Sequence, residues 1–398
     1  MTAFVLGGVQ TDFARHLSRD GKELVDLFGE LVDGALAAAR IDATDVGTIH
    51  VGNAFGELFA AQGHLGAMAA TARPALWGVP ASRHEAACAS GSAAILAAMA
   101  ELAAGMYDVA LVVGVEQERN VPGEQAARYL AAAGWAGHEG DGARYFWPHA
   151  FAHIADVYAE RHGLERAHLD AIAAKAFANA KDNPLAQTRA WSVDPASETN
   201  AVVEGRLRRS DCAQVTDGGA ALVLASPRFA EAWAGTRGEA LACLPRILGW
   251  GHASVGLPLA PKLERSAGGG LMFPHVAQVA DDARRRASTS LEAIRAFEVH
   301  DCFTITEYLA IEHLGLGDPK RAIEAGHTQR TGKTPINASG GLIGGGHPVG
   351  ATGVRMVVDA ARQVAGTAGA AQLDGASTVQ TLNLGGSTAT VISFVVGT

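Results

Sequence analysis

Residues 88–115, CASGSAAILAAMAELAAGMYDVALVVGV, decide the fold class. Residues 89–104 are small and apolar enough for a buried helix, and residues 109–115 form a β-branched, almost wholly apolar run. A helix leading into a strand that is apolar on both faces is typical of a sheet covered by helices on both sides. The stretch therefore predicts a layered α/β protein whose inner strands pair mainly in parallel.

The same alternation recurs outside this stretch. Apolar spacing predicts further strands at residues 3–7, 48–51, 220–224, 246–250 and 298–300, and further helices at 24–39, 151–161, 166–181 and 349–364. Residues 377–396 are nearly all small, β-branched or apolar, with a break at Gly385-Gly386, and predict a hairpin that closes a sheet.

The chain predicts two related halves. Its 398 residues exceed the roughly 250–300 that a single core usually fills. A helix opens at Cys88 in the first half and after His347 in the second, an echo that places a reactive residue at equivalent helix N-termini. We expect a first half in residues 1–118 and 201–240 and a second half in residues 241–398. Residues 119–200, richer in Trp, His and charge, are expected to cover the first half's site; an ordinary surface subdomain explains their composition equally well.

Composition excludes several classes of function. Hydrophobic residues make up 48% of the chain and charged residues 18%, which is a globular composition. The net charge is −9 and no Lys/Arg run is longer than three residues, so we expect no nucleic-acid partner. No apolar stretch is long enough to span a bilayer and no signal peptide is apparent, which favours a cytoplasmic protein with no membrane association. The four cysteines form no Cys-x-x-Cys pair, and Cys212 and Cys243 are expected to be structural.

Three segments carry candidate chemistry. Cys88 follows a predicted strand and opens a helix, where unpaired N–H groups favour a thiolate and can bind an oxyanion; a buried structural cysteine is the alternative. His347 lies in the glycine-rich run 340–353, fixed just before a helix and suited to act as a base. His300, Asp301 and Cys302 lie at a strand–helix turn, and because successive residues do not converge on one ion, we expect no metal there.

Together these segments resemble the thiolase superfamily, and within it the sterol-carrier-protein-type thiolases. Cys88-Ala89-Ser90 resembles the nucleophile segment, His300-Asp301-Cys302-Phe303 matches the His-Asp-Cys-Phe block of that subgroup, and Gly346-His347-Pro348 matches the Gly-His-Pro block. The blocks occur in the family's order and the resemblance covers residues 1–398. It implies a five-layered αβαβα fold built from two βαβαβαββ halves, with a helical loop domain inserted in the first.

The resemblance also implies a chemistry. Thiolases act on coenzyme A thioesters, without a metal or further cofactor, and make or cleave 3-oxoacyl-CoA through a cysteine acyl-enzyme. Cys88 is the implied nucleophile, His347 its base and Cys302 the acid/base that moves the α-proton. His300 and His347 are implied donors to the enolate oxygen, and the backbone N–H groups of Cys88 and Gly385 to the tetrahedral oxyanion.

One position departs from the commoner thiolases. They carry a second catalytic cysteine in a Cys-x-Gly-Gly segment, and Asn383 stands there in this chain, within Asn383-Leu384-Gly385-Gly386. In the sterol-carrier-type subgroup the cysteine of the His-Asp-Cys-Phe block supplies the missing thiol. The departure therefore supports the subgroup and favours Cys302.

Other functions are compatible with parts of the pattern. A hydrolase would need Cys88 and His347 but not Cys302. A C–C lyase or C-acyltransferase working with a small OB-fold partner belongs to the same superfamily, but such relatives typically lack the nucleophilic cysteine. A catalytically inactive acyl-CoA-binding scaffold would not need the trio. The family usually forms homodimers or homotetramers.

Overall fold

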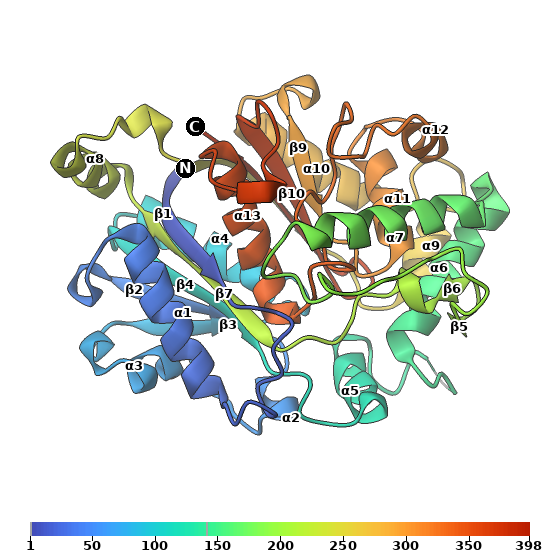
Figure 1. Cartoon of the computed structure of the whole chain (residues 1–398), viewed down its shortest axis with the longest axis horizontal. Helices are drawn as coiled ribbons and strands as arrows, with labels where there is room; N and C mark the ends of the chain where they lie inside the picture. The colour runs from blue at the N-terminus through green and yellow to red at the C-terminus, as the bar shows by residue number, and fades with distance from the viewer. Residues whose placement is uncertain (1, 141) are drawn as a thin grey trace.

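The computed structural model describes residues 2–140 and 142–398 and is built around one long mixed sheet (Figure 1). Its nine strands lie in the order β3-β2-β4-β7-β1-β8-β11-β10-β9. They are β1 (Ala3–Gln10), β2 (Thr48–Gly52), β3 (Ala81–His84), β4 (Val109–Glu116), β7 (Gly218–Ala225), β8 (Arg246–Ser254), β9 (Ala296–Val299), β10 (Thr378–Gly385) and β11 (Thr390–Gly397). A separate two-stranded ribbon pairs β5 (Val202–Glu204) with β6 (Leu207–Arg208).

Helices cover both faces of each half of this sheet and so form the predicted layers. Helices α4 (Ser90–Ala103) and α13 (Thr352–Val364) contact each other and pack between the halves, in a core that draws on strands of both. Helices α1 (Leu24–Ala39), α3 (Met68–Ala72) and α8 (Pro227–Arg237) cover the outer face of the first half, and α10 (Pro274–Arg286) and α11 (Thr304–His313) that of the second. The predicted αβαβα fold is confirmed.

Each half follows nearly the same order of elements. In the first half β1, α1, β2, the short helices α2 (Gly56–Phe59) and α3, β3, α4, β4 and β7 give the pattern βαβαβαββ. In the second half β8, α10, β9, α11, α13, β10 and β11 repeat it. There the third strand is reduced to one bridge between Ile336 and Phe297. The halves join where β1 pairs with β8.

The expectation of mainly parallel pairing is wrong. Three strand pairs are parallel (β2–β3, β2–β4 and β9–β10), whereas β1–β7, β1–β8, β4–β7, β8–β11 and β10–β11 are antiparallel. An apolar run such as Val109–Glu116 shows only that both faces of a strand are covered. Because helices cover both faces here, antiparallel strands carry the same pattern that is usual for parallel ones.

The remaining helices lie mostly in the segment that follows β4. They are α5 (Gly123–Leu130), α6 (Phe146–His162) and α7 (Arg166–Lys181), followed in the second half by α9 (Leu259–Arg265) and α12 (Pro319–Glu324). The four-part division of the chain stays a prediction. Within residues 2–140 and 142–398, no helix has both the length and the apolar character of a bilayer span.

Candidate active site

A cavity of about 220 Å³ brings together four of the five predicted site residues. Cys88, His300, Cys302 and His347 all line it. They arrive from three turns: Cys88 just before α4, His300 and Cys302 after β9, and His347 shortly before α13. The Cys88 sulfur and one ring nitrogen from each histidine lie within 4.8 Å of one another. The packing of the two halves therefore brings residues that are far apart in the sequence to one cavity.

The turn before α4 presents Cys88 to this cavity. Ala87 has φ 50°, a left-handed conformation that is unfavourable for a residue with a Cβ. The Ser90 hydroxyl supports the turn, because its Oγ accepts from the Ala86 N–H at 2.9 Å and donates to the Ala87 carbonyl at 2.6 Å. Backbone strain held by such contacts is common where a reactive side chain must face a ligand.

Cys88 is a neutral thiol in the resting site. Burial, and next the charge of Glu118, raise its pKa to about 12, against the lowering effect of the Gly386 N–H, which donates to the sulfur. The expected stabilisation of a thiolate by the helix N-terminus is therefore outweighed by desolvation. Attack by this sulfur requires a base that removes the proton as the reaction proceeds.

His347 is oriented to be that base. The Thr352 hydroxyl donates to the Pro348 carbonyl at 3.1 Å, so its oxygen accepts the Nδ1–H of His347 at 2.8 Å. The proton of the neutral ring is thereby fixed on Nδ1, and Nε2 keeps its lone pair. Burial, and then the charge of Arg355, lower the pKa of His347 to about 3, so the resting ring is neutral.

His300 lies beside the other ring, with the two ring centroids 5.1 Å apart. Its Nδ1 is 3.1 Å from the side-chain nitrogen of Asn383, which also donates to the Cys88 carbonyl at 3.1 Å. Burial, and next the neighbouring His347, hold the pKa of His300 well below its usual value. Both rings are therefore neutral, and their reactivity depends on which nitrogen carries the proton.

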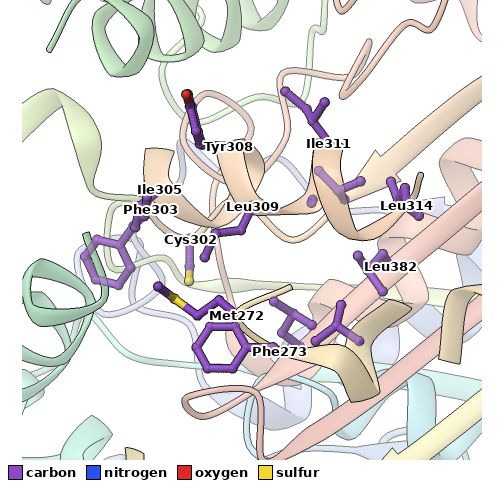
Figure 2. Close-up of a cluster of buried hydrophobic side chains, with 14 of the residues drawn as sticks. Met272, Phe273, Cys302, Phe303, Ile305, Tyr308, Leu309, Ile311, Leu314 and Leu382 are labelled. Atoms are coloured by element: carbon purple, nitrogen blue, oxygen red, sulfur yellow. The ribbon is translucent and has the colours of Figure 1, made fainter. Parts of the chain in front are cut away.

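Cys302 occupies a more apolar part of the site. It precedes α11 and belongs to the same buried cluster as Met272, Phe303 and Leu309 (Figure 2). Burial, and next the nearby Cys88, raise the pKa of the Cys302 thiol well above its usual value. Asp301 turns away from it, and its carboxylate accepts the Leu342 N–H at 2.6 Å. Asp301 does not line the cavity that His300 and Cys302 share.

Gly385 lies beside the cavity and is absent from its lining, whereas Gly386 lines it. An added Cβ at Gly385 would lie 2.3 Å from the Ala86 carbonyl oxygen, so the β10 end must be glycine to approach the Cys88 turn. The Asn383 side chain of β10 and the N–H of Gly386, directly after β10, contact Cys88.

The structure adds groups that motif spacing did not reveal. Glu118 is 1% exposed, lines the cavity, and accepts the Val349 N–H at 3.3 Å. Burial, and next the charge of Glu116, raise the pKa of Glu118 well above its usual value. Cys212 also lines the cavity, although its thiol donates to the Arg208 carbonyl at 3.5 Å. Much of the remaining wall comes from residues 119–200, namely Gly123, Ala127, Leu130, Ala133, Tyr145, Phe146, Trp147, Pro148 and Phe151. An apolar residue at such positions gives no signal of which cavity it will face.

Comparison with known proteins agrees with this geometry. Residues 3–201 match the family described as "Thiolase, N-terminal domain", and residues 265–398 match "Thiolase C-terminal domain-like". Acetyl-CoA acetyltransferase from Methanothermobacter thermautotrophicus is 30% identical over 386 residues, covering 96% of both chains. Sterol carrier protein 2 of Homo sapiens is 27% identical over 405 residues, covering 98% of this chain and 71% of that protein.

A solved structure extends the likeness to the fold. The Ltp2-ChsH2(DUF35) aldolase superposes with a TM-score of 0.78 at 20% identity, covering 100% of this chain and 97% of that chain. Two matched domains, a relative aligned along nearly the whole chain and the cavity described above agree with the motif resemblance. The chain belongs to the thiolase family, in its sterol-carrier-protein-type branch.

Proposed function

We propose that this chain is an acyl-CoA C-acyltransferase that makes or cleaves 3-oxoacyl-CoA. The observation that carries the proposal is the convergence of Cys88, His347, His300 and Cys302 on one cavity. The acetyl-CoA acetyltransferase relative supports coenzyme A thioesters as the substrates. The reaction needs no group beyond these side chains and the thioesters, so we propose that no further cofactor is required.

The first half-reaction forms the acyl-enzyme. The Cys88 sulfur attacks the thioester carbonyl carbon while His347 Nε2 takes the thiol proton. The backbone N–H groups of Cys88 and Gly385 are the proposed donors to the tetrahedral oxyanion, and removing one such donor typically costs about 2.7–4 kcal/mol of barrier. The C–S bond to coenzyme A then breaks, and the leaving sulfur takes the proton of Cys302. An imidazolium at His347 and a thiolate at Cys302 remain.

The second half-reaction uses that pair of charges. The Cys302 thiolate removes an α-proton from a second acyl-CoA, and the resulting enolate oxygen accepts from His300 and from the now protonated His347. The α-carbon attacks the acyl-Cys88 carbonyl, and the Cys88 sulfur leaves and recovers its proton from His347. Degradation follows the same steps in reverse. Neutral His347 has no proton on Nε2, so its role as an enolate donor exists only after acylation.

The setting of the enzyme is also proposed. We infer a cytoplasmic protein that assembles as a homodimer or homotetramer, as the family resemblance suggests. A small OB-fold partner is not needed for the steps above, because Cys88 and Cys302 are both present. A partner-dependent C–C lyase remains the second candidate.

Turnover with purified protein tests the function. Acetoacetyl-CoA and CoA should give acetyl-CoA with wild type, and Cys88→Ala should abolish this product. Cys243→Ala is the matched control, since Cys243 is exposed and outside the cavity. Thiolysis by Cys88→Ala at the wild-type rate would refute the assignment of the nucleophile. Release of free acid by wild type in place of a second thioester would indicate the hydrolase.

A further inference from the structure

We propose that Asn383, which stands where other thiolases carry a catalytic cysteine, is a positioning residue that fixes the proton of His300 on Nε2. This inference rests on the proposed function, because it assigns His300 the task of donating that proton to the enolate oxygen. Asn383, in place of the cysteine of other thiolases, thereby has a role distinct from the acid/base role of Cys302.

The orientation of the Asn383 amide is determined by its partners. The Cys88 carbonyl can only accept, so the Asn383 atom that lies 3.1 Å from it is the NH₂ group. The Ser92 hydroxyl donates to the other atom, Oδ1, at 2.8 Å. Asn383 is fully buried, and α13 packs close against this pair: a Cβ added at Gly353 would lie 2.2 Å from Ser92 Oγ and 2.7 Å from Asn383 Oδ1. A flipped amide would face a carbonyl with its own oxygen.

This orientation decides the tautomer of His300. The same Asn383 NH₂ lies 3.1 Å from His300 Nδ1, and since it is a donor, Nδ1 must accept. The proton of the neutral ring is then on Nε2, which is free to donate into the cavity. His347 has the opposite arrangement, with its proton on Nδ1 and a bare Nε2. The two adjacent rings are therefore prepared as one donor and one base.

A cysteine at position 383 would not give the same result. A thiol is a weak donor with a single hydrogen, whereas the amide supplies two N–H groups to two acceptors at once. In this chain the acid/base thiol is Cys302, on the turn after β9, which leaves the β10 position available for a residue that orients His300. Because Cys302 of the His-Asp-Cys-Phe block supplies the acid/base thiol, position 383 can hold an asparagine in place of a cysteine.

The tautomer can be measured directly. In protein labelled with ¹⁵N-histidine, the bare and protonated ring nitrogens have well separated ¹⁵N shifts, and the His300→Gln difference spectrum assigns the signals. Wild type should show the proton on Nε2. In Asn383→Asp the carboxylate can only accept, so the proton should move to Nδ1. Asn200→Asp, the same substitution at a partly buried loop residue away from the cavity, should leave the spectrum of His300 unchanged.

Kinetics of the separate half-reactions distinguish positioning from general damage. In Asn383→Asp, condensation of preformed acyl-Cys88 with acetyl-CoA should slow by about 10²–10³-fold, the usual effect of losing one oxyanion donor. Acylation of Cys88 should slow less than condensation, because its oxyanion is held by backbone groups. Ser92→Ala, which frees Asn383 Oδ1 but leaves its NH₂ contacts, should have a smaller effect.

Three results would overturn the proposal: a wild-type proton on Nδ1, an Asn383→Asp variant whose tautomer and condensation rate match wild type, or equal losses in both half-reactions. The spectrum is read on the resting protein without substrate. If wild type formed no acyl-enzyme, the proposed function would fail while the spectrum still decided the tautomer.

Discussion

At the scale of single residues, the site depends on burial more than on charge. Desolvation raises the pKa of Cys88 to about 12 and lowers the pKa of His347 to about 3, and both shifts favour the neutral side chain. A thiolate–imidazolium pair therefore does not form in the resting enzyme. The identity of both residues could be predicted from motif spacing, but their protonation states could not, because those depend on what the folded chain packs around them.

This charge state predicts a distinctive alkylation profile. Because the pKa of Cys88 is raised from 9.0 to about 12, its thiolate fraction at neutral pH is below that of an exposed cysteine. Inactivation by iodoacetamide should be slow at neutral pH and rise continuously with pH, with no plateau near neutrality. The rate of Cys88 modification, followed by peptide mass spectrometry with exposed Cys243 as internal reference, checks this. Faster modification of Cys88 than of Cys243 at neutral pH would contradict it.

At the scale of elements, α4 and α13 position the chemistry. Each helix follows a turn that carries a reactive residue, and their contact brings Cys88 and His347 together. The internal echo in the sequence predicted these two helices, and α1 and α7 match their predicted ranges. The packing of α13 against Ser92 and Asn383 was not predictable, because a glycine such as Gly353 does not show which backbone it will touch.

Gly353→Ala tests that packing. The added Cβ would lie 2.4 Å from the Ser92 backbone nitrogen, and because backbone cannot step aside the helices must separate. We expect a loss of about 1–3 kcal/mol in unfolding free energy, typical of overpacked cores, together with reduced activity. Urea denaturation measures the change.

The control is Gly235→Ala in α8, where nothing lies within 4 Å of the added Cβ. It should raise stability by about 0.5–1 kcal/mol because alanine favours the helix. Equal stability of Gly353→Ala and wild type would show that the two helices are not in close contact.

At the scale of the whole molecule, the layers could be predicted and the strand directions could not. Alternating helices and apolar runs determine which surfaces must be covered, and the five layers follow. In each half the last strand pairs antiparallel with the first, β7 with β1 and β11 with β8. The direction of such a strand leaves no pattern in its sequence, because both of its faces are buried. Similarly, the predicted site residues lie in sequence motifs, whereas Glu118 and the aromatic residues of 119–200 that line the cavity do not.

Buried carboxyls couple global stability to pH. Burial raises the pKa of Glu116 from 4.5 to about 8, so the folded state binds a proton that the unfolded chain releases. The stabilisation is present below pH 4.5 and is lost as pH rises to about 8. In Glu116→Gln this contribution is absent, and stability should fall less over that range. Thermal unfolding of both proteins across the range tests it; identical pH dependence would contradict the prediction.

The intact mass of the protein after brief mixing with acetyl-CoA tests the assigned roles of Cys88 and Cys302. Wild type should gain one acetyl group, and Cys302→Ala should gain it more slowly, because the leaving sulfur has lost its proton donor. Cys88→Ala should gain none. Only wild type should then pass that group to a second acetyl-CoA and yield acetoacetyl-CoA. An acetyl group retained by Cys88→Ala, or acetoacetyl-CoA formed by Cys302→Ala at the wild-type rate, would contradict the assignment of Cys88 as nucleophile and Cys302 as the group that moves the α-proton.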